Sequence, residues 1–452
     1  MKNEGRDQTT GVIWQQILLF FFPILLGTFF QQLYNTADAV IVGNFVGKEA
    51  LSAVGGTTGT LINLLVGFFV GLSSGASVVI AQYYGGGRKD RVSQTVHTSL
   101  ALAIVGGLIL MAVGLIGAPL ALRLMNTPED IMPYSLTYIR IYFLGVVGNL
   151  IYNMGAAILR AVGDSKRPLY FLIASCFVNI VLDLLFVAVF HWEVMGAAVA
   201  TILSQFVSAV LVMMVLVRSK DSYHVSLKEI RINRHIVRRI FRIGLPAGFQ
   251  SAMYSISNII IQSSVNGFGT DTVAAWSAYS KIDGVFWMTM SAFGIAVTTF
   301  VGQNYGARKY QRVRRGIRQC LTMAMGTAIL MSVILYIFGN QVYRLFIDDP
   351  VVISRGEEIL HFLVPTFFTY VCIEILSGAL RGVGDSLVPM LMTCTGVCLL
   401  RVLWVLIAVP ISHQIQTLLF SYPLSWVITS ILFLIYYRYS RHIRSMPKLD
   451  EA

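Results

Sequence analysis

The sequence contains few charged residues. Only 12% of its 452 residues are Asp, Glu, Lys or Arg, about half the share found in soluble globular proteins. Hydrophobic residues make up 56%, and apolar segments of about 20 residues, each long enough to cross a bilayer, recur along the chain. These segments lack the apolar–polar alternation of outer-membrane barrel strands. The sequence therefore predicts an all-α, multi-pass integral membrane protein.

Twelve membrane spans are predicted. The first apolar segment has no small-residue cleavage site and continues into polar residues, so we interpret it as a span and not as a signal peptide. The predicted spans are residues 14–42, 51–82, 95–122, 134–159, 168–190, 195–217, 237–266, 272–303, 318–346, 357–380, 388–411 and 416–437.

Cysteine is scarce as well. The five cysteines are Cys176, Cys320, Cys372, Cys394 and Cys398. All five lie within predicted spans or at their edges, and the outer loops contain no paired cysteine spacing. We therefore expect free buried thiols, with neither a disulfide framework nor a cysteine metal site.

Several motifs of enzymes and nucleotide-driven pumps are missing. The sequence contains no phosphate-binding GxxxxGK[ST], no HExxH and no Ser/His/Asp set at one depth. The GGG at residues 85–87 lacks the Lys and Ser that open a phosphate-binding helix, so it indicates a loop. We expect no enzymatic activity and no cofactor, and we expect an ion gradient to drive any transport.

The net charge of +12 follows the predicted topology. If both termini are cytoplasmic, 27 of the 34 Lys and Arg residues lie on the cytoplasmic side, as the positive-inside rule requires. The opposite loops, such as GKEA and NTPED, carry several acids. We expect an inner or plasma membrane protein with no nucleic-acid partner, whose basic loops contact anionic membrane lipids.

Two phrases occur twice at one offset. LRAVGDSKRP at residues 159–168 returns as LRGVGDSLVP at 380–389, and VVIAQYYGGGRKDRV at 78–92 returns as TFVGQNYGARKYQRV at 299–313. Both pairs are 221 residues apart, which indicates an internal repeat. We predict a six-helix lobe over residues 1–217, a basic cytoplasmic linker over 218–236 and a second six-helix lobe over 237–452.

An even number of spans per lobe makes the two repeats run in the same direction. They are then related by a pseudo-twofold axis along the membrane normal, as in transporters built from parallel repeats. The repeated phrases themselves favour a mechanical role. Gly-Asp-Ser before a proline is typical of a turn followed by a helix N-cap, and Arg160 and Arg381 suit the C-terminal ends of the preceding helices.

The fifth span contains two polar residues that the repeat does not require. Asn179 and Asp183 lie four residues apart, on one face of a helix, and a carboxylate in hydrocarbon costs roughly 3 kcal/mol or more. At the 221-residue offset the second half has Leu400 and Trp404. The scaffold therefore does not need polar groups at these positions.

Charged residues differ between the two halves. The predicted spans of the second half contain two bases and two acids that can neutralise one another. These residues of the second-lobe polar network are Lys281, Asp283, Glu374 and Arg401. The first half instead has two acids, Asp38 and Asp183, with no base at similar depth.

Two unpartnered carboxylates must share a proton or bind a cation. At 1.5 Å per helical residue, Asp38, Asp183 and Thr201 each lie about 10 Å below the outer surface, with Asn179 one turn deeper. Their hard oxygen ligands suit Na⁺ and would serve equally as a proton site. The sequence predicts a cation site here, and the choice between Na⁺ and H⁺ stays open.

The sequence resembles the multidrug and toxic compound extrusion (MATE) transporters over its whole length. The resemblance is carried by the repeated QxYG-type and LRxxGDxxxP phrases, by PILLGTFFQQLYNTADAVIVGNFVG in the first span, by NIVLD in the fifth and by GLPAGFQS at the start of the seventh. It implies an antiporter that exports organic, often cationic and aromatic, compounds in exchange for inward Na⁺ or H⁺.

The resemblance also implies site residues. In the similar lineage, a first-span Asp, a fifth-span Asn and Asp, and a sixth-span Thr form the cation site, and these match Asp38, Asn179, Asp183 and Thr201. Other branches place acids in spans seven and ten. This chain has Glu374 in span ten but no acid in span seven, which puts a second-lobe cation site in doubt.

Substrate would lie in a cleft between the lobes. Its candidate lining residues, each equally compatible with ordinary core packing, are Gln32, Tyr34, Gln250, Met253, Tyr254 and Trp287. We expect a monomer with small organic substrates. The alternative function is a lipid-linked precursor flippase of the same broad superfamily, which would require a cationic cavity; the acidic first half argues against it.

Overall fold

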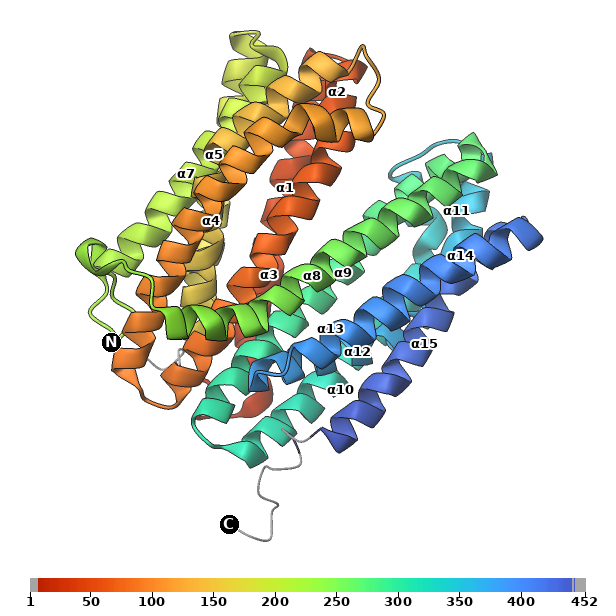
Figure 1. Cartoon of the computed structure of the whole chain (residues 1–452). Helices are drawn as coiled ribbons and strands as arrows, with labels where there is room; N and C mark the ends of the chain where they lie inside the picture. The colour runs from red at the N-terminus through yellow and green to blue at the C-terminus, as the bar shows by residue number, and fades with distance from the viewer. Residues whose placement is uncertain (1–6, 441–442, 444–452) are drawn as a thin grey trace. The chain divides into compact units, whose positions relative to one another are not determined.

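The computed structural model describes residues 7–440 and residue 443, and within this part of the chain it contains helices and turns but no β-strand. Figure 1 shows the helices in chain order. They form two compact units. The first unit contains Phe22–Ala252, and the second contains Gln8–Phe21 together with the chain from Met253 onward. The predicted lobes follow the sequence repeat and not this packing, and their boundaries stay a prediction.

The first unit is built around one central helix. Its elements are α1 (Ile13–Phe45, from Phe22 on), α2 (Lys48–Gly55), α3 (Thr57–Gly85), α4 (Lys89–Leu124), α5 (Met132–Ala161), α6 (Lys166–Asp183), the π-helix η1 (Leu184–Val189) and α7 (Glu193–Arg218). Helix α5 packs against α3, α4 and α7, and α6 packs against α7. A Cβ on Gly114 of α4 would lie 2.2 Å from the Phe143 ring of α5, so this close contact requires glycine.

The basic linker after α7 packs on the first unit. It contains the short 3₁₀ helix η2 (Leu227–Glu229), and its side chains Tyr223 and Val225 are buried. The backbone N–H of Ser226 donates to Nε2 of His97 on α4, at 3.0 Å. The linker is therefore an ordered part of the first unit.

The second unit contains the remaining elements. They are α8 (Arg234–Val265, from Met253 on), η3 (Asn266–Phe268), α9 (Thr270–Gly306), α10 (Tyr310–Arg344), α11 (Pro350–Leu363), η4 (Val364–Thr366), α12 (Phe368–Val383), α13 (Leu387–Thr393), the π-helix η5 (Cys394–Leu399), α14 (Leu400–Ile411) and α15 (Ile415–Tyr439). Helix α9 packs against α10, α11 and α12, and α15 packs against α12 and α14. The first helix of each sequence repeat, α1 or α8, is thus divided between the two units.

Ten helices in the described part of the chain are long and apolar enough to cross a membrane. An eleventh candidate is the pair Pro350–Thr366 and Phe368–Val383, which is bent by 51°. The predicted span 357–380 falls on this bent pair. Pro365 lies in the 3₁₀ turn at the bend, and a proline cannot donate a backbone hydrogen bond inside a helix. Helix α8 occupies the predicted seventh span but begins with the basic RHIVRRIFR, which lowers its hydropathy.

The repeated Gly-Asp-Ser turns have the expected backbone. Gly163 and Gly384 both have positive φ, 89° and 98°, a conformation that glycine adopts without strain. Asp164 Oδ1 accepts from the backbone N–H of Arg167 at 3.2 Å, as predicted for a helix start. In the second copy, Asp385 Oδ2 accepts from the Tyr436 hydroxyl at 2.6 Å, so this aspartate joins the turn to α15. All five cysteines carry free thiols.

Candidate cation-binding site

Four predicted site residues of the first unit are buried on three helices. Asp38 lies on α1, Asn179 and Asp183 on α6, and Thr201 on α7. Their exposed fractions are 4%, 0%, 0% and 3%. A polar side chain at this level of burial costs free energy unless it finds a partner or a ligand.

The backbone of α6 changes at this site. The α-helical part ends at Asp183, and the next six residues form the π-helix η1. A π-helical turn is wider than an α-helical turn, and such turns occur frequently at functional sites. The change of pitch begins at the carboxylate itself.

The two carboxyl groups of the site lie next to each other. Asp38 and Asp183 interact side chain to side chain, and the Tyr138 hydroxyl of α5 lies beside Asp38. Thr201 lies beside Tyr138 in turn. The structure therefore brings Asp38, Asp183 and Thr201 into one cluster, with Asn179 one turn from Asp183 on α6.

Most polar atoms of this cluster have no hydrogen-bond partner in the described part of the chain. These atoms are Oδ1 of Asp38, both carboxylate oxygens of Asp183, and Oδ1 and Nδ2 of Asn179. Thr201 Oγ1 donates to the Ala197 carbonyl at 2.9 Å, which leaves its lone pairs available. Buried polar atoms are almost always bonded, so these oxygens fit a bound cation or proton.

Neither carboxylate has a basic partner in the part of the chain that the structure describes. Within the described residues, no Lys, Arg or His nitrogen lies within 4.0 Å of Asp38 or Asp183. The same residues contain no group of three or more His, Cys, Asp and Glu side chains that could hold a metal ion. The candidate ligands for a cation are thus two carboxylates and the neutral side-chain oxygens of Asn179 and Thr201.

Sequence reasoning missed several side chains around this cluster. Tyr138 was not predicted, and Tyr34, predicted as a cleft residue, lies beside Gln205 and within electrostatic reach of Asp38. Tyr142 also lies beside Gln205. The sequence did contain a signal for two of these residues. Tyr34 lies four residues before Asp38 and Gln205 lies four residues after Thr201, so each is one helical turn from a predicted site residue.

The polar residues predicted in the second half are not joined as ion pairs. Within the described residues, none of Lys281, Asp283, Glu374 and Arg401 forms an ion pair within 4.0 Å. The Lys281 side chain is exposed, so it does not neutralise a buried acid of the second unit. Their part in transport stays a prediction.

Aromatic side chains contact the three other predicted residues of the second half, Asp283, Glu374 and Arg401. Asp283 accepts from Trp287 Nε1 at 2.5 Å and lies within electrostatic reach of Arg401. Arg401 is 2% exposed, and its guanidinium stacks 4.1 Å from the centre of the Tyr422 ring. Glu374 accepts from the Tyr370 hydroxyl at 3.0 Å.

The predicted cleft residues are divided between the units. Gln32, Tyr34 and Gln250 belong to the first, and Met253, Tyr254 and Trp287 to the second. The Tyr254 and Tyr370 hydroxyls are 3.3 Å apart, and the Trp287 ring packs edge-on against Tyr370 with centroids 4.6 Å apart. A role of the six residues in substrate binding stays a prediction.

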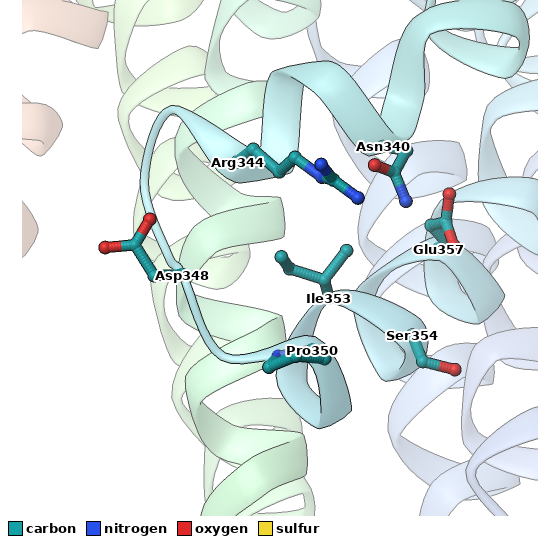
Figure 2. Close-up of a pocket in the computed structure, with 7 residues that line it drawn as sticks. All are labelled: Asn340, Arg344, Asp348, Pro350, Ile353, Ser354 and Glu357. Carbon is teal, nitrogen blue, oxygen red and sulfur yellow. The ribbon is translucent and has the colours of Figure 1, made fainter.

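One surface pocket lies between the end of α10 and the start of α11. It has a volume of about 400 Å³ and is lined by Asn340, Arg344, Asp348, Pro350, Ile353, Ser354 and Glu357. Figure 2 shows Arg344, Asn340 and Glu357 around it, with Ile353 between them and Asp348 pointing away. None of the predicted site residues lines this pocket.

Comparison with known proteins places the chain in a family. The family model described as MatE matches residues 23–185 and again residues 246–407. The two matches begin at Pro23 of α1 and Pro246 of α8 and together cover more than half of the chain. The protein is a member of the MatE family. Both copies of the internal repeat are thus copies of one family unit.

Relatives of this MatE protein extend over nearly its full length. The probable multidrug resistance protein YoeA of Bacillus subtilis is 28% identical over 439 residues, covering 94% of each chain. The probable multidrug resistance protein NorM of Thermotoga maritima is 25% identical over 406 residues, covering 87% of this chain and 85% of NorM.

Solved structures share the fold. A MOP superfamily transporter from Pyrococcus furiosus has a TM-score of 0.91 at 23% identity, covering 99% of this chain and 100% of that one. An outward-facing multidrug resistance MATE family transporter has a TM-score of 0.91 at 22% identity, covering 99% of both chains. The chain is a two-lobe, multi-pass membrane transporter and not an enzyme.

Proposed function

We propose that the protein is a secondary active antiporter that exports organic compounds in exchange for inward Na⁺ or H⁺. The observation that carries the proposal is the pair Asp38 and Asp183. These are two adjacent buried carboxyl groups that have unbonded oxygens and no basic partner among the described residues. Carboxylates inside a membrane protein mark ion or proton pathways because they are costly to keep there.

The residues present fit either cation. Na⁺ would be held by oxygens of Asp38, Asp183, Asn179 and Thr201, which are hard ligands. A proton would instead lie on one of the two carboxyl groups, which relieves their mutual repulsion. Ca²⁺ and Mg²⁺ require a fuller oxygen cage than these four residues supply. No cofactor is needed in either case.

The exchange step follows from charge. A cationic substrate is attracted by the two carboxylates while they are unoccupied. Entry of Na⁺ or H⁺ from outside removes that negative charge and so lowers the affinity for the substrate, which is a coupling between two ligands. Rocking of the two lobes, the motion typical of parallel-repeat transporters, would then release the substrate outward.

The substrate class rests on the relatives. YoeA and NorM are described as probable multidrug resistance proteins, and this favours small organic compounds, often cationic and aromatic, as substrates of this chain. We place the protein in the cell membrane, with both termini cytoplasmic, as a monomer whose basic loops contact anionic lipids.

Dye efflux from everted vesicles under an imposed Na⁺ or pH gradient tests the proposal. We expect Asp183→Asn and Asp38→Asn to lower gradient-driven efflux at least tenfold. Asp90→Asn is the matched control, because Asp90 is exposed at the start of α4, and it should keep the parent rate.

Two outcomes would contradict the proposal. Parent-level efflux in both Asp38→Asn and Asp183→Asn would remove the coupling role of this site. Translocation of a lipid-linked precursor without any dye efflux by the parent would assign the flippase function instead.

A further inference from the structure

The N-terminal part of α1 packs within the second unit, although the remainder of α1 carries Asp38 in the first. Ile17, Phe20 and Phe21 are buried, with exposed fractions of 1%, 3% and 4%. The Phe21 ring stacks on Phe293 of α9 with centroids 4.0 Å apart. One continuous helix therefore belongs to both units.

The residues just before α1 are held by a dense set of hydrogen bonds. We name Gln8–Gly11 the N-terminal strap. Its backbone groups at Gln8 bond to the side chains of Gln303 and Asn304 on α9, both at 3.1 Å. The Lys309 ammonium donates to the Thr9 carbonyl at 2.8 Å.

Arg312 of α10 makes further contacts with the strap. Its guanidinium donates to the carbonyl oxygens of Gln8, Thr10 and Gly11, the shortest at 2.7 Å. It also lies 5.5 Å above the Phe300 ring. A single arginine thus bonds three strap residues, and hydrogen bonds from charged donors are the stronger kind.

The second copy of the repeat shows the reciprocal arrangement. The N-terminal part of α8, up to Ala252, belongs to the first unit. Arg239 of α8 donates to Gln82 Oε1 at 2.6 Å and lies 4.6 Å above the Tyr83 ring. Gln82 and Gln303 are equivalent residues, 221 apart, in the repeated QxYG-type phrase. Each copy of that phrase therefore holds the first helix of the other repeat.

We propose that the strap is a permanent anchor that makes the N-terminal part of α1 move with the second unit throughout the transport cycle. Gln303, Asn304, Lys309 and Arg312 are its positioning residues, and Gln82 with Arg239 forms the counterpart. Because α1 continues to Asp38, movement of the second unit is transmitted along the helix to the cation site. This last consequence rests on the proposed antiport function.

Hydrogen–deuterium exchange tests the anchor without any transport assay. We expect peptides spanning residues 8–21 to stay protected with and without Na⁺ and at both neutral and acidic pH. Arg312→Ala should speed exchange at residues 8–11 by about tenfold or more, because several charged hydrogen bonds are lost. Arg315→Ala, an exposed arginine on the same helix, should leave it unchanged. Exchange of 8–21 at unprotected rates, or loss of protection on adding either cation, would overturn the anchor.

A reducible cross-link tests permanence during transport. Thr9→Cys and Lys309→Cys would be joined by a short bis-thiosulfonate, with each single variant treated alike as a control. A permanent anchor predicts that the cross-linked protein keeps at least about half of the efflux rate measured after reduction. Efflux that is abolished by the cross-link and restored by reduction would show that the strap opens. If the parent exports nothing, the antiport proposal fails, while the exchange experiment still decides the anchor.

Discussion

The Tyr138 hydroxyl of α5 lies beside the Asp38 carboxylate. We predict that Tyr138→Phe keeps the ring packing but raises the Na⁺ or proton concentration needed for half-maximal efflux. The shift should be about tenfold or more, since one hydrogen bond to a charged group contributes roughly 1.5 kcal/mol or more. Efflux measured against cation concentration gives the value.

The control for this prediction lies one turn away. Tyr134 is half-buried on the same helix, and Tyr134→Phe should leave the cation dependence unchanged. The thermal unfolding temperature of both variants in detergent should stay close to that of the parent. Equal cation dependence in Tyr138→Phe and the parent would exclude the hydroxyl from the site.

At the residue scale, the sequence is informative about charges and less so about neutral polar groups. Asp38 and Asp183 are visible because a carboxylate inside an apolar segment has few explanations. Tyr138 is not, because a tyrosine in a span is compatible with ordinary core packing. Lys281 shows the opposite error: its place within a span predicted burial, but it lies on the exposed face of α9.

At the element scale, α3 and the N-terminal part of α8 cross where glycines of the two helices face each other. A Cβ on Gly71 would lie 2.5 Å from the Cα of Gly248, and a Cβ on Gly75 would lie 2.5 Å from the backbone nitrogen of Gly244. Such close approach is typical of small residues at membrane helix interfaces. The neighbouring atoms are backbone, so they cannot rotate away.

We predict that Gly71→Ala destabilises the protein by about 1–3 kcal/mol, the usual range for overpacking, and lowers its unfolding temperature. Gly326→Ala is the matched control, since Gly326 lies inside α10 with no atom near its added Cβ. That control should be neutral or slightly stabilising, because alanine favours helix over glycine. An unfolding temperature of Gly71→Ala equal to that of Gly326→Ala would contradict the tight crossing.

The positions of the helices could be predicted from apolar runs, but their irregularities could not. Pro365 lies at the 51° bend between α11 and α12, but proline is also tolerated within membrane-spanning helices, so it does not predict a bend on its own. The π-helices η1 and η5 have no sequence signal of this kind, because LLFVAV and CTGVCL are ordinary apolar segments. Packing by neighbouring helices decides such turns.

At the scale of the whole molecule, we predict the orientation in the membrane from the basic loops and from the parallel repeat. The loop after α4 and the loop after α10 occupy equivalent places in the two repeats. Both should lie outside the cell if the halves run in the same direction. The basic turns before α4 and before α10 should lie in the cytoplasm.

Single cysteines at exposed positions test this topology. We predict that Glu129→Cys and Asp348→Cys react with a membrane-impermeant maleimide in intact cells, whereas Arg88→Cys and Arg315→Cys react only after permeabilisation. The parent supplies the blank, since its five cysteines lie within helices. Labelling of Glu129→Cys and Asp348→Cys from opposite sides would mean an inverted repeat and exclude the pseudo-twofold axis along the membrane normal. Labelling of Arg88→Cys and Arg315→Cys in intact cells would reverse the orientation and place the basic loops outside.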